Sequence, residues 1–178
     1  MHPLAARRAR AHLTDCVGYL GVAAALVPTG ILVATTTDLG TRQWYGHLVS
    51  AIPPAIATMI AARAESGPRR ATWGKRRQGL EVAEADGAPL TLGRALARNT
   101  AKLFVPWQLG HTVAVGAAWG GFEDRDPLTL TASVAVYAVI GLYAWTTLRG
   151  SGRGVHDLVA DSRVAALAPG PVGAPSPS

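Results

Sequence analysis

The chain has 178 residues, of which 49% are hydrophobic, and a formal net charge of +6 at pH 7. Ala, Val, Leu and Gly supply most of the apolar surface, and small residues let transmembrane helices pack closely. The basic residues cluster between long uncharged runs and no nucleic-acid recognition motif is present, so no nucleic-acid partner is expected. A single cysteine, Cys16, allows neither a disulfide framework nor a CxxC metal or redox site.

Four stretches without Lys, Arg, Asp or Glu reach the ~20 residues that a helix needs to cross a bilayer. They are residues 16–34, 44–62, 103–121 and 128–148. Prolines and polar side chains interrupt the second and third stretches, and in lipid the freed backbone groups must then be satisfied by neighbouring helices or water. We therefore predict an all-α, polytopic transmembrane bundle of about four spans, in which the third segment either spans or is re-entrant.

The charges of the loops predict the orientation, because cytoplasmic loops near spans are enriched in Lys and Arg. The N-terminus, the loop 63–102 and the C-terminal segment from residue 149 are basic, whereas the loop 122–127 is acidic. This alternation predicts a multi-pass protein of the bacterial inner membrane with cytoplasmic N- and C-termini. An alternative is a cleaved signal peptide at residues 16–34, which the length of the stretch and Asp15 at its mouth disfavour.

The loop between the second and third stretches contains a predicted hairpin. Asp86-Gly87 is a turn dipeptide, with apolar residues at alternating positions on both sides, from Leu80 and from Leu90. Pro89 lies in the second arm, so the hairpin must be an edge or irregular one.

An amphipathic helix is predicted to follow this hairpin, with Thr91 as its cap. Basic residues recur along it at four-residue intervals, at Arg94, Arg98 and Lys102. Such a helix lies along the inner membrane surface, so the lipid bilayer and its anionic headgroups are expected partners. The residues expected to contact the headgroups are Lys75, Arg76, Arg94 and Arg98.

A second short amphipathic segment is predicted after the fourth stretch, with Val155, Leu158 and Val159 on one face. Residues 166–178 are mainly Pro, Gly, Ala and Ser without periodicity, and we predict a disordered tail there. The domain thus comprises residues 1–165.

Asp15 is the most informative polar residue, because a carboxylate at the beginning of a membrane span needs a partner, a cavity or an ion path. Arg8, Arg10 and Arg153 are its candidate partners, and an interfacial carboxylate stabilised by the helix dipole is the alternative. His47 and His111 lie inside spans, where hydrogen bonding between helices is expected more than a proton relay.

No sequence pattern predicts an enzyme. There is no phosphate loop, no Gly-x-Ser-x-Gly elbow and no His-Glu-x-x-His motif. His156 is next to Asp157 but has no second ligand at zinc spacing. We therefore expect no catalytic residue, no cofactor and no metal.

Three segments resemble motifs of the RDD family of membrane proteins. Residues 8–15 resemble its Arg-x-x-Ala-x-x-x-Asp motif. Residues 72–98 contain Gly-Lys-Arg, Gly-Leu-x-Val, Asp-Gly and Arg-Ala-Leu-x-Arg in the family's order and spacing, and residues 153–158 resemble its closing His-Asp motif. Two features depart from the pattern: Arg10 competes with Arg8 for the first role, and Asp161-Ser162 stands where Gly-Thr is expected.

The resemblance implies an integral membrane protein in which Arg8, Asp15 and Asp157 are the marked residues. With Arg153, they are expected to form an ionic cluster on the cytoplasmic side that serves transport or structure. Transport, including cation/proton antiport, is the activity that the resemblance suggests. The alternative is a non-catalytic membrane scaffold or accessory subunit held by an Arg/Asp clasp. About four spans are few for a transport pathway, so a homo-oligomer or a membrane partner protein is expected.

Overall fold

The computed structural model describes residues 3–148 and 152–167, and in these residues the protein is mostly helical. The prediction of a helical fold is confirmed. The helices are α1 (Ala5–Thr36), η1 (Asp38–Thr41), α2 (Gln43–Ser50), α3 (Ile52–Ser66), α4 (Trp73–Arg77), α5 (Leu92–Asn99), η2 (Thr100–Phe104), α6 (Val105–Ala118), α7 (Pro127–Leu148) and α8 (Val155–Val159). Two short strands are also present, β1 (Leu80–Glu84) and β2 (Ser162–Ala166).

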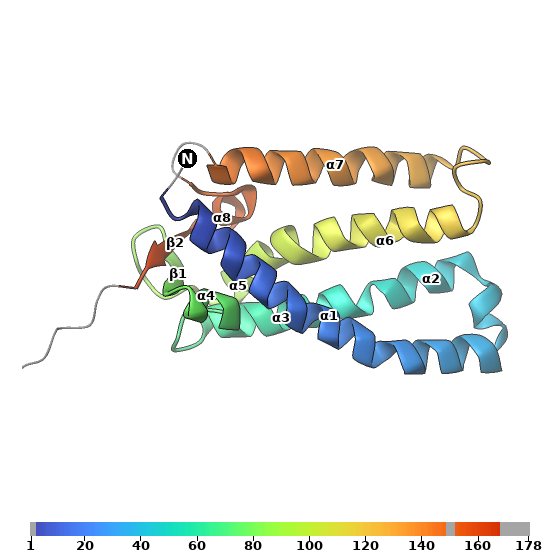
Figure 1. Ribbon diagram of the computed structural model, residues 1–178, viewed down its shortest axis with the longest axis horizontal. Helices are drawn as coiled ribbons and strands as arrows, with labels where there is room; N and C mark the ends of the chain where they lie inside the picture. Colours follow the sequence, from blue (N-terminus) through green and yellow to red (C-terminus); the bar gives the residue numbers. More distant parts are fainter. Residues whose placement is uncertain (1–2, 149–151, 168–178) are drawn as a thin grey trace, which may run out of the picture.

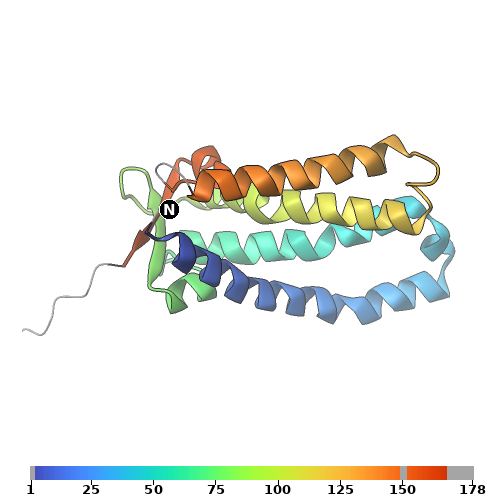
Figure 2. The same cartoon turned by 45° about the horizontal axis from the view of Figure 1, so that its top comes forward.

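The long helical segments lie side by side along the molecule: α1, then α2 with α3, then α6 and α7 (Figure 1). The turned view in Figure 2 shows the same arrangement. The short elements α4, α8, β1 and β2 gather at one end, beside the beginning of α1 (Figure 1). We call this end, together with the adjoining residues of α3 and α5, the polar end.

Three helical segments are long and apolar enough to cross a bilayer, judged by length and composition: Ala5–Thr36, Gln43–Ser66 and Pro127–Thr146. They correspond to the first, second and fourth predicted stretches. The third stretch forms α6, which has 14 residues and directly follows the π-helix η2. Because α6 by itself is shorter than the ~20 residues of a span, spanning by this third stretch stays a prediction.

Prolines mark the beginnings of two helices. Pro53 and Pro54 lie in the first turn of α3, and Pro106 lies in the first turn of α6. The first-turn N–H groups of α3 have no partner inside that helix, so its prolines remove no hydrogen bond. The second predicted stretch is therefore divided at Ala51 into α2 and α3. Helix α6 continues from η2, where the N–H of Val105 donates to the carbonyl of Thr100.

Large apolar side chains face outward, whereas small ones lie inside. Val134 and Tyr137 of α7 are 72% and 76% exposed. In the interior, Ala57 and Ala61 of α3 are fully buried in a cluster with Tyr19. Outward apolar surface with small residues between helices is the arrangement expected of helices packed in lipid.

The two strands form an antiparallel pair that joins the middle of the chain to its end. Val82 of β1 lies opposite Val164 of β2. The predicted irregular hairpin is present in short form, because Ala83 forms an isolated antiparallel bridge with Pro89 across the Asp86-Gly87 turn. The regular pairing of β1 is with β2, on its other edge, and the sequence does not predict it.

The predicted start of the tail at residue 166 is wrong. Ala166 pairs with Leu80, and the N–H of Leu167 donates to the carbonyl of Gly79 at 2.9 Å. The rest of the predicted tail, residues 168–178, lies outside the described residues.

Helices α6 and α7 make close contact at a glycine. A Cβ atom built on Gly116 would lie 2.0 Å from Oγ1 of Thr129, a residue that is 1% exposed. In the same helix, a Cβ on Gly110 would meet nothing within 4 Å. Gly116 is thus required by packing, whereas Gly110 is not.

Substitution of Gly116 by Ala is expected to destabilise the protein by about 1–3 kcal/mol, because the added methyl group must push α6 and α7 apart. Gly110→Ala is the matched control in the same helix and should be neutral or stabilising by up to about 1 kcal/mol. Thermal unfolding in detergent micelles measures both effects. Equal effects of the two substitutions would contradict this account of the contact.

Candidate functional site

Five charged side chains are buried together at the polar end, and we call them the ionic cluster. All of these side chains are at most 10% exposed. Each comes from a different helix, namely α1, α3, α4, α5 and α8. The members are Arg8, Glu65, Lys75, Arg98 and Asp157.

Arg98 lies at the centre of the ionic cluster and bridges two carboxylates. Its Nη1 atom donates to Oε1 and Oε2 of Glu65 at 2.9 and 2.8 Å. Its Nη2 and Nε atoms donate to Oδ1 of Asp157 at 2.7 and 3.1 Å. The planar guanidinium has donors on both sides, so one side chain can hold α3 and α8 against α5.

Glu65 receives two further donors besides Arg98. The ammonium group of Lys75 and Nδ2 of Asn99 both donate to it, the latter at 2.9 Å. Glu65 follows Ala57 and Ala61 at four-residue spacing, so it lies on the buried face of α3.

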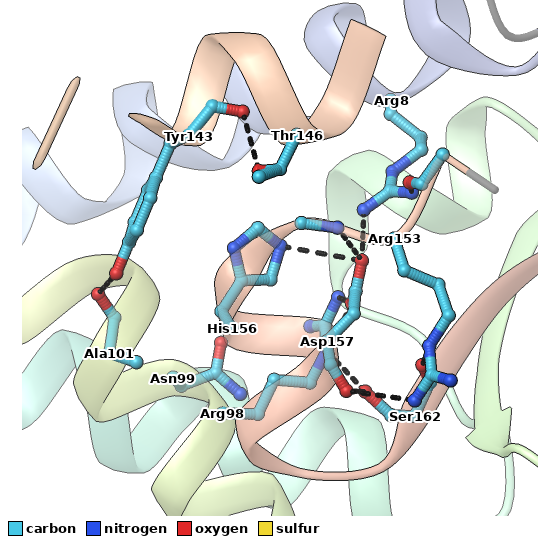
Figure 3. Close-up of polar contacts among 12 residues, drawn as sticks. Arg8, Arg98, Asn99, Ala101, Tyr143, Thr146, Arg153, His156, Asp157 and Ser162 are labelled. Carbon is cyan, nitrogen blue, oxygen red and sulfur yellow. Dashed lines mark hydrogen bonds and ion pairs between the residues drawn. The ribbon is translucent and has the colours of Figure 1, made fainter. Parts of the chain in front are cut away.

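Asp157 is held at the beginning of α8 (Figure 3). Its Oδ2 atom accepts hydrogen bonds from Nη2 of Arg8 and from the N–H of Gly154, the latter at 3.0 Å. Because the carboxylate of Asp157 satisfies a first-turn N–H, it also caps its own helix. The Arg8–Asp157 pair joins the first helix to the last one.

Asp15 makes a separate contact, to α4. Its Oδ2 atom accepts from Oγ1 of Thr72 at 2.6 Å and its Oδ1 atom accepts from the N–H of Gly74 at 2.7 Å. A Cβ atom on Gly74 would lie 2.1 Å from the carbonyl oxygen of Ala11, so only glycine permits this approach of α4 to α1.

The environment of the cluster keeps Asp157 and Arg98 charged. Burial raises the pKa of Asp157, but the charge and hydrogen bonds of Arg98 and the charge of Arg8 outweigh burial and hold that pKa well below its usual range. Burial lowers the pKa of Arg98, and Glu65 and Asp157 raise it above its ordinary value. For His156, burial and the charge of Arg98 lower the pKa to about 2, so the ring is neutral.

A family model described as the RDD family matches residues 2–161. The chain belongs to the RDD family. Comparisons with curated proteins and with solved structures give no match.

Three residues mark the RDD family, and in this protein two of them contact each other while the third has other partners. Arg8 and Asp157 contact each other, as an ionic cluster requires. Asp15 contacts none of its predicted partners: Arg8 pairs with Asp157, Arg153 pairs with Asp161 at 2.9 Å, and Arg10 is exposed. Neutral donors satisfy Asp15, so the expectation of an arginine partner for it is wrong.

Two of the four predicted headgroup contacts are also wrong for this RDD protein. Lys75 and Arg98 are 5% and 1% exposed, and both bind Glu65. Arg76 and Arg94 are exposed, and Arg94 pairs with Glu84 at 2.6 Å. Thr91 caps α5 as predicted, by accepting from the N–H of Arg94 at 3.3 Å.

The sequence interpretation missed Glu65, although its spacing relative to Ala57 and Ala61 predicts that it is buried. It also missed Gly74, whose role depends on contact with a residue far away in the chain. The buried side of α5 is Ala95, Arg98 and Asn99, so the basic row predicted for membrane contact contains an inward-facing arginine.

Among the described residues, neither imidazole inside the predicted spans bonds to a neighbouring helix, so that expectation is wrong: His111 bonds within α6, and Nε2 of His47 is buried without a partner. Nε1 of Trp107 donates to Nε2 of His111 at 3.3 Å, and the two rings stack. The carbonyl of His47 accepts from Nε2 of Gln108 at 3.4 Å. Within residues 3–148 and 152–167, no group of three or more His, Cys, Asp or Glu is placed to hold a metal ion.

Asp157→Asn is expected to destabilise the protein by about 3–5 kcal/mol, because it leaves Arg8 and Arg98 buried with too little negative charge. Asp161→Asn is the matched control: its side chain is 62% exposed, and loss of its pair with Arg153 should cost less than about 1 kcal/mol. Unfolding in micelles at pH 7 measures both. A similar small loss for the two variants would contradict the importance of the buried site.

The stability should also depend on pH through His156. Its pKa of about 2 in the folded protein lies below the ordinary 6.5, so the unfolded chain binds the extra proton and stability falls as the pH decreases below about 6.5. The depressed pKa of Asp157 adds a further loss below its ordinary 3.8. His156→Gln should flatten the unfolding temperature between pH 6.5 and 4. Parallel curves for the two proteins would show that His156 is not buried in its neutral form.

Proposed function

We propose that this protein is a non-catalytic membrane scaffold or accessory subunit, in which the ionic cluster is a structural clasp. The proposal rests on one observation: each carboxylate of the ionic cluster already accepts hydrogen bonds from several donors. Glu65 has donors from Lys75, Arg98 and Asn99, and Asp157 has donors from Arg8, Arg98 and Gly154. Carboxylates held in this way are poor proton or cation carriers, because releasing a partner leaves a buried charge unpaired.

The position of the clasp supports a structural role. It ties α1, α3, α4, α5 and α8 together, and these elements come from the beginning, middle and end of the chain. Helices in lipid gain little from hydrophobic contact with each other, so ion pairs at their ends are a suitable way to fix their order. Buried ion pairs contribute more to a specific arrangement than to net stability.

The proposed placement has the polar end in the cytoplasm of a bacterial cell, with both termini there and α6 crossing the inner membrane beside α7. The basic loop 63–102 and the acidic loop 122–127 support this orientation. Arg76 and Arg94 then lie on the cytoplasmic surface within reach of anionic headgroups. The exposed apolar surface of α7 is available to lipid, to a second copy or to a membrane partner protein.

Transport, including cation/proton antiport, is the second candidate function. One observation favours it: burial and the charges of Lys75 and Arg98 lower the pKa of Lys102 to about 7. An amine with this pKa exchanges its proton near neutral pH. Lys102 lies beside the ionic cluster. It is a different residue from the two aspartates that mark the family, Asp15 and Asp157.

Flux measurements on proteoliposomes discriminate between these functions. With Na⁺, K⁺ or Li⁺ gradients and a pH-sensitive dye inside the vesicles, the wild type is expected to give no cation-driven proton flux, because its carboxylates are occupied. An added ionophore provides the positive control for the dye and the gradient. Flux in the wild type that is lost in folded Asp15→Asn and Asp157→Asn variants would contradict the scaffold proposal and establish antiport.

A further inference from the structure

A cavity of about 430 Å³ lies next to the ionic cluster, between α1, α7 and the residues where α5 continues into α6. This volume is within the range of small-molecule binding sites. Figure 3 shows part of its wall, with His156 between Tyr143 and the Arg8–Asp157 pair. Six basic side chains line the cavity and no carboxylate does: Arg8, His12, Lys75, Arg98, Lys102 and His156.

Lys102 is the cation in this wall that lacks a counterion. Among the described residues, its ammonium group has no hydrogen-bond or ion-pair partner. Glu65 is near enough to attract it, but the oxygens of Glu65 already accept from Lys75, Arg98 and Asn99. Lys102 is half-buried, and an ammonium group in a cavity wall without a counterion leaves the site electrostatically incomplete.

The charged groups around the cavity show how much negative charge is missing. Arg8, Lys75, Arg98 and Lys102 are four cations, and Asp15, Glu65 and Asp157 are three carboxylates, which leaves one positive charge without an anion. The electrostatic complement of the site is therefore one monoanionic group.

Two imidazoles supply further unused polar atoms. Nδ1 of His12 and Nδ1 of His156 are buried without a hydrogen-bond partner, and both side chains line the cavity. Nδ1 of His12 can donate to an acceptor oxygen when the neutral ring carries its proton there. Nε2 of His156 lies 3.7 Å from Oδ2 of Asp157, which favours the proton on Nε2 and leaves Nδ1 as an acceptor. The cavity wall thus offers hydrogen-bonding atoms that a polar ligand can use.

The remaining wall is apolar. Ile140, Ala144 and Leu148 of α7 and Pro106 of α6 line it, opposite alanines near the beginning of α1. Ile140 is 53% exposed. It belongs to the outward apolar surface of α7, which is available to lipid. The cavity thus combines a cationic inner wall with an apolar wall on a lipid-facing helix.

From these observations we infer that the cavity is a binding site for one anionic phospholipid, with its phosphodiester on Lys102 and its hydrocarbon chain along α7. The phosphodiester of a lipid without a headgroup cation supplies the single negative charge that the site lacks, and its oxygens accept from Lys102 and His12. Phosphatidylcholine has the same phosphodiester, but its choline cation cancels that charge and would lie among the basic side chains of the cavity. The pKa of Lys102, lowered to about 7 by burial and by Lys75 and Arg98, returns toward its ordinary value when the anion is bound. The cavity shares Arg8, Lys75 and Arg98 with the ionic cluster, but lipid binding there holds whether the protein is a scaffold or a transporter.

Native mass spectrometry of the purified protein in micelles tests this inference with dioleoyl phosphatidylglycerol as the anionic probe and dioleoyl phosphatidylcholine as the neutral one. One phosphatidylglycerol is expected per chain, with a Kd at least about tenfold lower than for phosphatidylcholine, as expected from one buried charge pair. Lys102→Met should raise the Kd for phosphatidylglycerol at least about tenfold. Arg42→Gln removes one exposed positive charge from the segment between α1 and α2, away from the polar end, and is the matched control, with a change below about twofold.

A misfolded variant is recognised by its unfolding temperature without lipid. Lys102→Met should be at least as stable as the wild type there, because it removes a half-buried cation that has no counterion. Equal affinity for the two lipids, wild-type affinity in Lys102→Met, or an equal loss in Arg42→Gln would overturn the inference. A competition arm with millimolar inorganic phosphate separates the two sources of phosphate: no displacement of phosphatidylglycerol is expected, and full displacement would identify a site for free phosphate instead.

Discussion

The guanidinium group of Arg98, buried between Glu65 and Asp157, is the contact on which the polar end of this protein depends. Both carboxylates are fully buried, and neither has access to enough solvent to remain charged without a cation. Arg98 supplies that cation to both, while Lys75 pairs with Glu65 and Arg8 pairs with Asp157. The folding of α3, α5 and α8 against one another is therefore coupled: displacing any one of them exposes or isolates a charge on another.

This coupling explains why a bundle with so few large buried side chains holds a defined arrangement. The interior contacts of α1 and α3 are made by alanines and one tyrosine, and the large apolar side chains of α7 point outward. In lipid such contacts discriminate weakly between alternative helix orders, because lipid chains are as apolar as the side chains. The directional hydrogen bonds of Arg98, and of Asp15 with Thr72 and Gly74, add the discrimination.

The sequence was sufficient to predict the helical class, the family and three helices of membrane type, because these depend on local hydrophobicity, spacing and motifs. It was also sufficient to mark Arg8, Asp15 and Asp157. Their partners could not be predicted, since Asp15 meets Gly74 and Arg8 meets Asp157 only after distant segments fold together. The pairing of β1 with β2 was missed for the same reason: Asp86-Gly87 indicates a local hairpin, and nothing near Val82 indicates Val164. Arg98 was assigned to the membrane surface because a basic row was treated as a uniform face, whereas Arg94 and Arg98 differ completely in burial.

A double-mutant cycle on Arg8 and Asp157 tests the central claim, that buried ion pairs clasp the two ends of the chain. The free energy of unfolding would be measured in micelles at pH 7 for the wild type, Arg8→Gln, Asp157→Asn and the double variant. The account predicts that the double variant loses less than the sum of the single losses, with a coupling energy of about 1.5 kcal/mol or more, as for close pairs in buried sites. A coupling energy near zero would mean that the two groups are neighbours without energetic consequence, and would contradict the clasp.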